Sequence, residues 1–223
     1  MSALRFENVT RSFRTRRGDV VALDRADLAV REGEFLVLKG PSGSGKTTLL
    51  LTAGGLLSPS EGRVLVGGRD VYEMPDGERA RFRRKEIGFV FQLYHLVPYL
   101  SLLENVLLAA AGPKGAALEK ARAYLALFRL AGREHHKPSE LSAGERQRAA
   151  VARALINSPR LVLADEPTGN LDPENAEAVL ECLAGYHREG GTVVLATHGT
   201  DADRRADRVL LLREGRIEKP AEA

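Results

Sequence analysis

Cysteine and tryptophan are almost absent: the 223 residues contain one cysteine, Cys182, and no tryptophan. A single cysteine rules out a disulfide within the chain, and such a residue ordinarily packs as a small apolar side chain in a protein of the reducing cytosol. Neither sign of charge predominates, because 33 basic and 30 acidic residues leave a net charge of only +3. Nucleic-acid-binding proteins usually concentrate basic residues on one face, so we expect no nucleic-acid partner.

Long hydrophobic runs are missing as well. The longest apolar stretch, residues 49–57, is interrupted by Thr52, Gly54 and Gly55, and it is far shorter than the roughly 20 residues that span a bilayer. The first residues lack the apolar core of a signal peptide. We therefore expect that any membrane role is exercised through a partner.

Apolar runs predict an α/β fold. Residues 35–38, 161–164 and 193–196 are continuous apolar runs, which are typical of strands buried on both faces. The middle of the chain, about residues 101–157, is predicted to be helical. Shorter strands are expected at residues 4–6, 20–23, 28–30, 63–66 and 87–91. The order of these segments indicates strands and helices in alternation, with a helical insert.

Capping signals mark the starts of three helices. A Ser followed three residues later by Glu forms a capping box, and Asp followed by Pro is a cap with proline in the first turn. Residues 46–57 are expected to form a further helix after a glycine-rich turn, and the glycine pair at 190–191 to end the last helix. The three capping signals are Ser101 with Glu104, Ser142 with Glu145, and Asp172 with Pro173.

The glycine-rich turn reads Gly-Pro-Ser-Gly-Ser-Gly-Lys-Thr and matches the phosphate-binding pattern G-x-x-x-x-G-K-[ST] in full. Its glycines let backbone N–H groups face phosphate oxygens, and the helix that starts at Gly45 adds the positive end of its dipole. We expect Lys46 to bridge the β- and γ-phosphates of a nucleotide and Thr47 to ligate Mg²⁺. The predicted nucleotide site comprises Gly40, Pro41, Ser42, Gly43, Ser44, Gly45, Lys46, Thr47 and Thr48.

Two adjacent acids, Asp165 and Glu166, end the buried strand at residues 161–164. Because side chains alternate along a strand, the two carboxylates serve different positions. Asp165 is predicted to reach Mg²⁺ through water, and Glu166 to polarise the attacking water near the γ-phosphate, as phosphoryl transfer requires. A strand that leaves into a charged turn is the alternative, which the upstream phosphate loop disfavours.

A third motif, Leu-Ser-Ala-Gly-Glu at residues 141–145, narrows the choice among nucleotide-binding enzymes. It resembles the signature motif of ABC ATPases, usually Leu-Ser-Gly-Gly-Gln, although a well-capped helix would also account for it. The resemblance implies a RecA-like P-loop core, an antiparallel β subdomain and an inserted helical subdomain, all in one domain spanning residues 1–223. Residues 1–92 and 159–223 would form the core with the β subdomain, and residues 93–158 the helical subdomain.

The same resemblance implies roles for single residues. Gln92 would sense Mg²⁺ and the attacking water, His198 would contact the γ-phosphate, and Asp172 would belong to a loop that communicates across a dimer. Phe13 lies where the family stacks an aromatic ring on adenine, although a place in the core is its alternative. Ser142 and Gly144 would contact the γ-phosphate of the nucleotide that a partner chain binds.

Alanine at position 143 departs from the usual glycine of the signature. If the backbone there is left-handed, alanine costs on the order of 1 kcal/mol; if it is helical, alanine is harmless.

Within the family the chain resembles the lipoprotein-release and macrolide-export branch. This implies an ATP-hydrolysing transporter subunit that sandwiches two ATP molecules in a dimer and drives export through a separate membrane subunit, at the cytoplasmic face of the inner membrane. Signalling through a membrane partner to the cell-wall or division machinery is the alternative. The partner contact is expected at residues 93–100, whose apolar and aromatic side chains could instead form a lid inside the helical subdomain.

Overall fold

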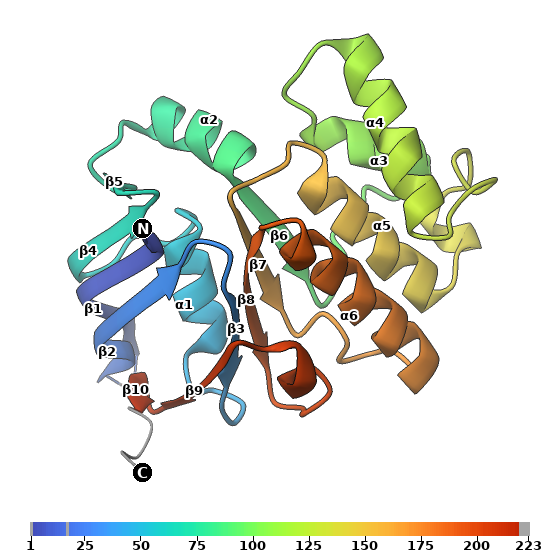
Figure 1. Ribbon diagram of the computed structural model, residues 1–223. Coiled ribbons are helices and arrows are strands. Elements are labelled where there is room, and N and C mark those ends of the chain that lie inside the picture. The colour runs from blue at the N-terminus through green and yellow to red at the C-terminus, as the bar shows by residue number, and fades with distance from the viewer. Residues whose placement is uncertain (1, 17, 219–223) are drawn as a thin grey trace.

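The computed structural model describes residues 2–16 and 18–218. Two β-sheets and a set of helices make up this part of the chain (Figure 1). One sheet is antiparallel, in the order β2-β1-β4-β5. Its strands are β1 (Ser2–Thr15), β2 (Gly18–Arg31), β4 (Glu61–Val66) and β5 (Arg69–Asp70). Residue 1 and residues 219–223 of the predicted domain lie outside the described residues.

The second sheet has six strands in the order β10-β9-β3-β8-β7-β6, and all neighbours are parallel except β9 and β10. Its strands are β3 (Phe35–Lys39), β6 (Ile87–Phe91), β7 (Leu161–Asp165), β8 (Thr192–Thr197), β9 (Arg208–Arg213) and β10 (Arg216–Glu218). Because β3, β8, β7 and β6 run the same way, the loops that follow them meet along one edge of the sheet.

Alternating side chains of the parallel strands feed two separate hydrophobic clusters. Phe35 and Val37 of β3 face one cluster, whereas Leu36 and Leu38 face the other. The first cluster packs against α5 (Ala143–Leu155) and α6 (Pro173–Arg188), and the second against α1 (Lys46–Ala53) and the antiparallel sheet. The period-two alternation explains why these strands read as continuous apolar runs: both faces of the sheet are covered.

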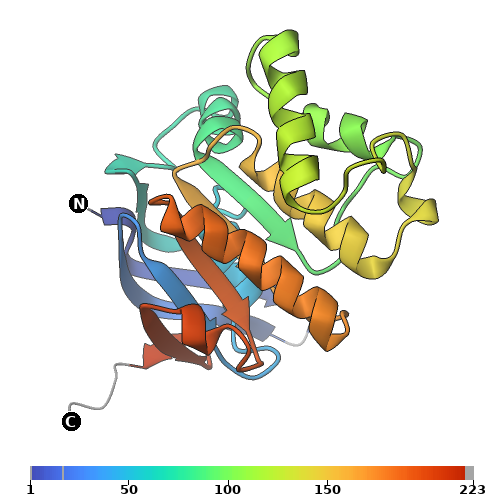
Figure 2. The same ribbon diagram turned by 45° about the vertical axis from the view of Figure 1, so that its right-hand side comes forward.

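The remaining helices gather beyond the β6 edge of the parallel sheet, where α3 (Leu102–Ala109), α4 (Lys114–Leu127) and α5 pack on one another (Figures 1 and 2). Helix α2 (Asp76–Glu86) precedes β6, and short 3-10 turns lie at Pro138–Glu140 and Asp203–Arg205. The predicted helical insert is thus present. The capping boxes of α3 and α5 are confirmed, as is the Asp172 cap of α6, which ends at Arg188 before the glycine pair.

Several predicted boundaries were wrong. The strands expected at residues 20–23 and 28–30 are one 14-residue strand, β2, whose pairing with β1 is interrupted by register shifts rather than by turns. Helix α1 ends at Ala53 rather than at residue 57, because Gly55 takes a left-handed backbone with φ of +68° and the Leu56 N–H bonds back to the Leu51 carbonyl. Gly54 packs under Phe89, where a Cβ would lie 1.8 Å from the ring. The middle segment also contains non-helical stretches around the Pro138–Glu140 turn.

Candidate functional site

The residues predicted to bind and cleave a nucleotide converge on the carboxyl edge of the parallel sheet. The glycine-rich loop follows β3, and Gln92 follows β6. Asp165 is the last residue of β7 with Glu166 directly after it, and His198 follows β8. Residues far apart in the sequence therefore meet because four parallel strands end together.

The glycine-rich loop has the backbone that an anion cradle needs. Gly43 and Gly45 have φ of +80° and +106°, a region that L side chains rarely adopt. A Cβ on Gly45 would lie 2.3 Å from the Ala22 carbonyl oxygen, and one on Gly40 would lie 2.2 Å from that of Leu212. The buried hydroxyl of Ser44 has no hydrogen-bond partner among the described residues. Both glycine backbone and orphaned hydroxyl fit a loop that closes around phosphate oxygens.

Lys46 lies almost buried at the start of α1 and points back into this loop. Its Nζ donates to the carbonyl oxygens of Gly40 and Pro41 at 2.7 and 3.2 Å. The same Nζ lies 3.6 Å from Oε1 of Glu166. The ammonium is therefore held over the loop, beside the carboxylate expected to act on water.

The Glu166 carboxylate is fixed from two sides. Its Oε2 lies 3.0 Å from Nδ1 of His198, opposite the contact with Lys46. Its backbone has φ of +44°, uncommon for a residue other than glycine. The Glu166 N–H donates to the carbonyl of Ala196 at 2.9 Å, which helps to hold this conformation. Strained backbone that its surroundings enforce is a common feature of functional sites.

Asp165 faces a different partner. The Thr47 hydroxyl bonds to its carboxylate, whereas the buried Oδ1 has no partner among the described residues. Burial raises the pKa of Asp165 above its usual value, and the nearby Glu166 adds to this, while the bond from Thr47 and the charge of Lys46 oppose it. An orphaned buried carboxylate oxygen beside a threonine hydroxyl suits the oxygen-rich coordination of Mg²⁺.

Gln92 and Phe13 are the two remaining residues predicted to contact the nucleotide or its metal. A Cβ placed on Gly169 would lie 2.9 Å from Nε2 of Gln92, so the Gln92 amide packs against the loop that follows Glu166. Phe13, on β1, is partly exposed and belongs to neither core cluster. The guanidinium of Arg11 stacks on its ring, 4.6 Å from the centroid. The alternative of a plain core residue is therefore wrong for Phe13, whose face toward adenine stays a prediction.

The signature residues lie elsewhere. Ser142 caps α5, accepting from the Glu145 N–H at 3.2 Å, and Glu145 completes the capping box. In both views the start of α5 lies at the outer end of the helical part, away from the glycine-rich loop that follows β3 (Figures 1 and 2). Ala143 is the first residue of α5 and does not have positive φ. The departure from glycine therefore falls in helical backbone, where alanine is harmless.

Residues 23–169 match the model of the family described as ABC transporter. The chain belongs to the ABC transporter family. The lipoprotein-releasing system ATP-binding protein LolD 1 of Rhodospirillum rubrum is 46% identical over 97% of both chains. The macrolide export ATP-binding/permease protein MacB of Chlorobaculum tepidum is 42% identical over 93% of this chain, which spans 32% of that protein.

Solved structures agree on the ABC fold. A dimeric post-hydrolysis structure of the ATP-binding cassette MJ0796 bound to ADP and Pi is 37% identical, with a TM-score of 0.90 and 97% coverage of each chain. The predicted RecA-like core, antiparallel β subdomain and helical insert are thus confirmed, as is the prediction that the chain is an ATP-binding ATPase of this family. Among the described residues, no helix is long and apolar enough to cross a bilayer.

Helix α5 of this ABC protein is hydrogen-bonded to the backbone on both sides of Gln92. The buried Gln147 donates to the carbonyl of Phe91 at 3.2 Å, and Arg153 donates to the carbonyls of Tyr94 and His95. Tyr94 and His95 both have positive φ, so Arg153 holds an unusual left-handed pair. Neither Gln147 nor Arg153 was predicted from the sequence to have this role. Helix α5 also carries Arg146 and Arg148, so residue type alone does not single the two residues out.

The backbone of segment 93–100 is hydrogen-bonded to the helical part, while some of its apolar side chains are exposed to solvent. Asn105 of α3 is fully buried and bonds to both backbone groups of Val97, at 2.7 and 3.1 Å. Leu93 and Tyr99 remain 68% and 75% exposed. The backbone of this segment is thus bound to the helical part while two of its apolar side chains are exposed, and the partner contact stays a prediction.

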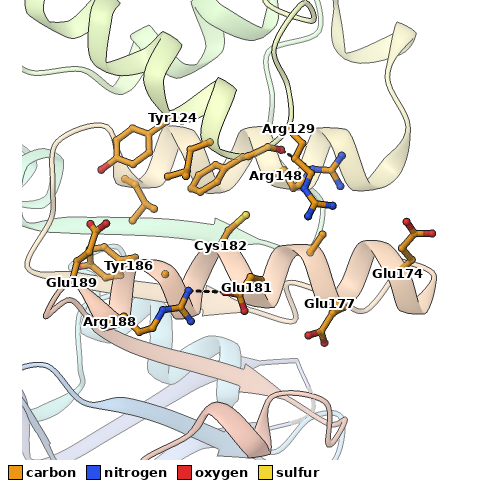
Figure 3. A pocket seen from close by; sticks show the side chains of 15 residues that line it. Tyr124, Arg129, Arg148, Glu174, Glu177, Glu181, Cys182, Tyr186, Arg188 and Glu189 are labelled. Atoms are coloured by element: carbon orange, nitrogen blue, oxygen red, sulfur yellow. Dashed lines mark hydrogen bonds and ion pairs between the residues drawn. The ribbon is translucent and has the colours of Figure 1, made fainter.

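A separate cavity of about 590 Å³ lies between α4 and α6 (Figure 3). Cys182 of α6 points into it, and Arg129 and Arg148 stand at one side. Burial raises the pKa of Cys182 to about 12, consistent with the inert side chain expected from the sequence. The cavity contains none of the residues predicted to bind nucleotide.

Proposed function

We propose that the chain is the motor subunit of a transporter: two copies sandwich two ATP molecules, and their opening and closing drives a separate membrane subunit. The observation that carries this proposal is the separation of the two halves of the site. Lys46 and Glu166 converge at the sheet edge, whereas Ser142 caps α5 at the outer end of the helical part. A second copy must therefore supply the signature to each nucleotide.

The side chains of the glycine-rich loop bind the phosphates. Without nucleotide, Lys46 donates hydrogen bonds to the carbonyls of Gly40 and Pro41. We infer that the ammonium leaves these carbonyls when ATP binds and then bridges the β- and γ-phosphates. Loop N–H groups and the N-terminus of α1 then face the phosphate oxygens. Phe13 offers its free ring face to adenine, and Ser42, Ser44 and Thr48 complete the cradle.

The carboxylate of Glu166 orients the attacking water and takes its proton. Contacts with Lys46 and His198 hold both oxygens in place before substrate arrives, so little reorganisation is needed at the moment of reaction. Gln92 approaches the same water from the β6 side, and His198 approaches the γ-phosphate from the β8 side. Thr47, Asp165 and Gln92 are the residues that would hold Mg²⁺, which would supply charge neutralisation to the phosphates.

The partner's Ser142 hydroxyl and Gly144 N–H complete each site across the dimer, with Asp172 beside them. ATP is then held by charges from both chains, and hydrolysis removes the γ-phosphate contact that joins them. The exposed Leu93 and Tyr99 form the proposed contact with the membrane subunit. Such a contact would hold the protein peripherally at the cytoplasmic face of the membrane. The LolD and MacB names of the relatives favour export or release of lipoproteins or hydrophobic compounds.

The test is the Glu166→Gln variant in MgATP. We expect it to bind ATP and to hydrolyse it at least about 100-fold more slowly than wild type does. It should be a dimer by light scattering, whereas wild type with ADP should be a monomer. Lys46→Ala within the same variant is the matched control, because it should abolish the dimer. A Glu166→Gln protein that binds ATP and stays monomeric would contradict the sandwich.

A pull-down with tagged Glu166→Gln from native membranes in ATP then identifies the partner. A membrane subunit with a large extracytoplasmic domain supports transport. A membrane protein joined to cell-wall hydrolases supports signalling to the division machinery instead, and recovery without any membrane protein contradicts both.

A further inference from the structure

Asn175 lies between two functional segments of the same chain. It is the third residue of α6, and its backbone N–H donates to Oδ1 of the capping Asp172 at 2.9 Å. Its side chain goes further than a cap requires: Nδ2 donates to Oδ2 of Asp172 at 2.7 Å. Both carboxylate oxygens of Asp172 are therefore held by a single residue.

The other end of the Asn175 carboxamide reaches α5, the helix that begins at the signature. Nη1 of Arg148 donates to Oδ1 of Asn175 at 2.9 Å, and Nε of Arg148 donates to the carbonyl of Phe128 at 3.1 Å. An amide can donate only from nitrogen and accept only at oxygen. The orientation of Asn175 is thus set by a carboxylate on one side and a guanidinium on the other.

Asn175 also packs directly on the signature glycine. A Cβ on Gly144 would lie 1.9 Å from Oδ1 of Asn175, 2.3 Å from its Cγ and 2.8 Å from its Cβ. Gly144 does not have positive φ and belongs to α5, so backbone conformation does not require glycine here. Close approach of the Asn175 side chain does.

We propose that Asn175 is a positioning residue that locks the Asp172 loop to the signature end of α5, so that both move as one surface toward the nucleotide of a partner chain. The role in the partner's site rests on the sandwich dimer proposed above. The lock itself is formed within one chain, by three hydrogen bonds between Asn175 and charged side chains and by one tight contact. Hydrogen bonds with an ionised partner are stronger than neutral ones, which suits a joint that must transmit movement.

The tight contact is tested by unfolding in urea. Gly144→Ala should raise the unfolding equilibrium constant at least tenfold in the wild-type background. In an Asn175→Gly background the same change should cost nothing, because no side chain remains to collide with, and Asn175→Ala should give partial relief since its Cβ stays. Gly185→Ala in α6 is the matched control: its new Cβ would meet only Arg188 Nη2 at 3.8 Å. Equal costs of Gly144→Ala in all three backgrounds would overturn the contact.

The positioning role is tested by ATP hydrolysis of the full chain in MgATP. Asn175→Ala should lower kcat about tenfold and bring the Hill coefficient toward 1, with unchanged nucleotide affinity of the monomer, because the glycine-rich loop is not touched. Asn175→Asp keeps an acceptor for Arg148 but turns a carboxylate oxygen toward Oδ2 of Asp172 in place of the donor, so it should lower kcat at least as far as alanine does. Wild-type kcat and Hill coefficient in Asn175→Ala would overturn the proposal.

The two proposals fail in different ways. If Asn175→Gly abolishes the stability cost of Gly144→Ala but Glu166→Gln never dimerises, the contact between Asn175 and Gly144 is supported and the sandwich dimer is contradicted. If Glu166→Gln dimerises while Asn175→Ala hydrolyses ATP with wild-type cooperativity, the sandwich stands and Asn175 is only a structural residue of α6.

Discussion

The Nδ1 atom of His198 lies 3.0 Å from Oε2 of Glu166, which joins the residue after β8 to the carboxylate after β7. Lys46 lies 3.6 Å from the other carboxylate oxygen. The proposed base, Glu166, is therefore already oriented without substrate, and each of its two side-chain neighbours can be removed separately.

Removing the imidazole should impair chemistry more than binding. In His198→Ala, Glu166 loses the imidazole but keeps Lys46 and the backbone N–H of residue 198, which donates to its Oε2 at 3.4 Å. We expect kcat to fall about 10- to 100-fold, in the lower part of the range for general acid–base groups, with a smaller change in KM. Steady-state phosphate release at several ATP concentrations measures both. The exposed His135→Ala is the control and should behave as wild type; an unchanged kcat in His198→Ala would remove His198 from the reaction.

Removing the ammonium should impair binding. Lys46→Ala deletes a charged donor from the glycine-rich loop, and a hydrogen bond to a charged group contributes about 1.5–3 kcal/mol, so ATP affinity should fall about 10- to 100-fold. Titration calorimetry gives the affinity directly, with circular dichroism to check folding. Lys85→Ala, at an exposed lysine of α2, should bind ATP as wild type does. Undiminished affinity in Lys46→Ala would exclude the predicted phosphate contact.

Asn105 should matter for stability. Its side chain is fully buried and bonds to the backbone of Val97, Leu100 and Ser101. Asn105→Ala removes the partner of the Val97 N–H and of the Leu100 carbonyl, whereas the carbonyls of Val97 and Ser101 keep backbone donors. We expect a loss of about 2–3 kcal/mol of unfolding free energy. Leu108→Ala on the same helix should change it by less than about 0.5 kcal/mol, because Leu108 is largely exposed. Urea unfolding compares the two, and equal losses would mean that Asn105 holds nothing in place.

Cys182 should resist alkylation. Burial raises its pKa to about 12, and the thiolate is the reactive form, so the rate with iodoacetamide near pH 7.5 should be about a thousandfold below that of a free thiol of pKa about 8.5. The native fold favours the neutral thiol, so its stabilising effect is complete below about pH 8.5 and is lost as the pH rises toward 12. Mass spectrometry follows labelling of native and urea-unfolded protein, and equal rates in both would show that the thiol is accessible.

Local chemistry made much of this protein predictable. Strand β3, the glycine-rich turn and the start of α1 follow from residues that are neighbours in the chain, and so do the capping boxes of Ser101 and Ser142. Two of the wrong boundaries had different causes. Helix α1 stops at Ala53 because the left-handed Gly55 ends it locally, whereas β2 is continuous because β1, a separate strand, pairs with it through bulges.

Sequence by itself determined which residue types the site contains and the order in which they follow the strands, because a motif records the chemistry of adjacent residues. Only the tertiary structure decided how they meet. Glu166 contacts Lys46 and His198 because parallel strands end at one edge. Gly144 lies under Asn175 because α5 and α6 pack together. Contacts between residues so distant in the chain depend on packing and register, which no local pattern encodes.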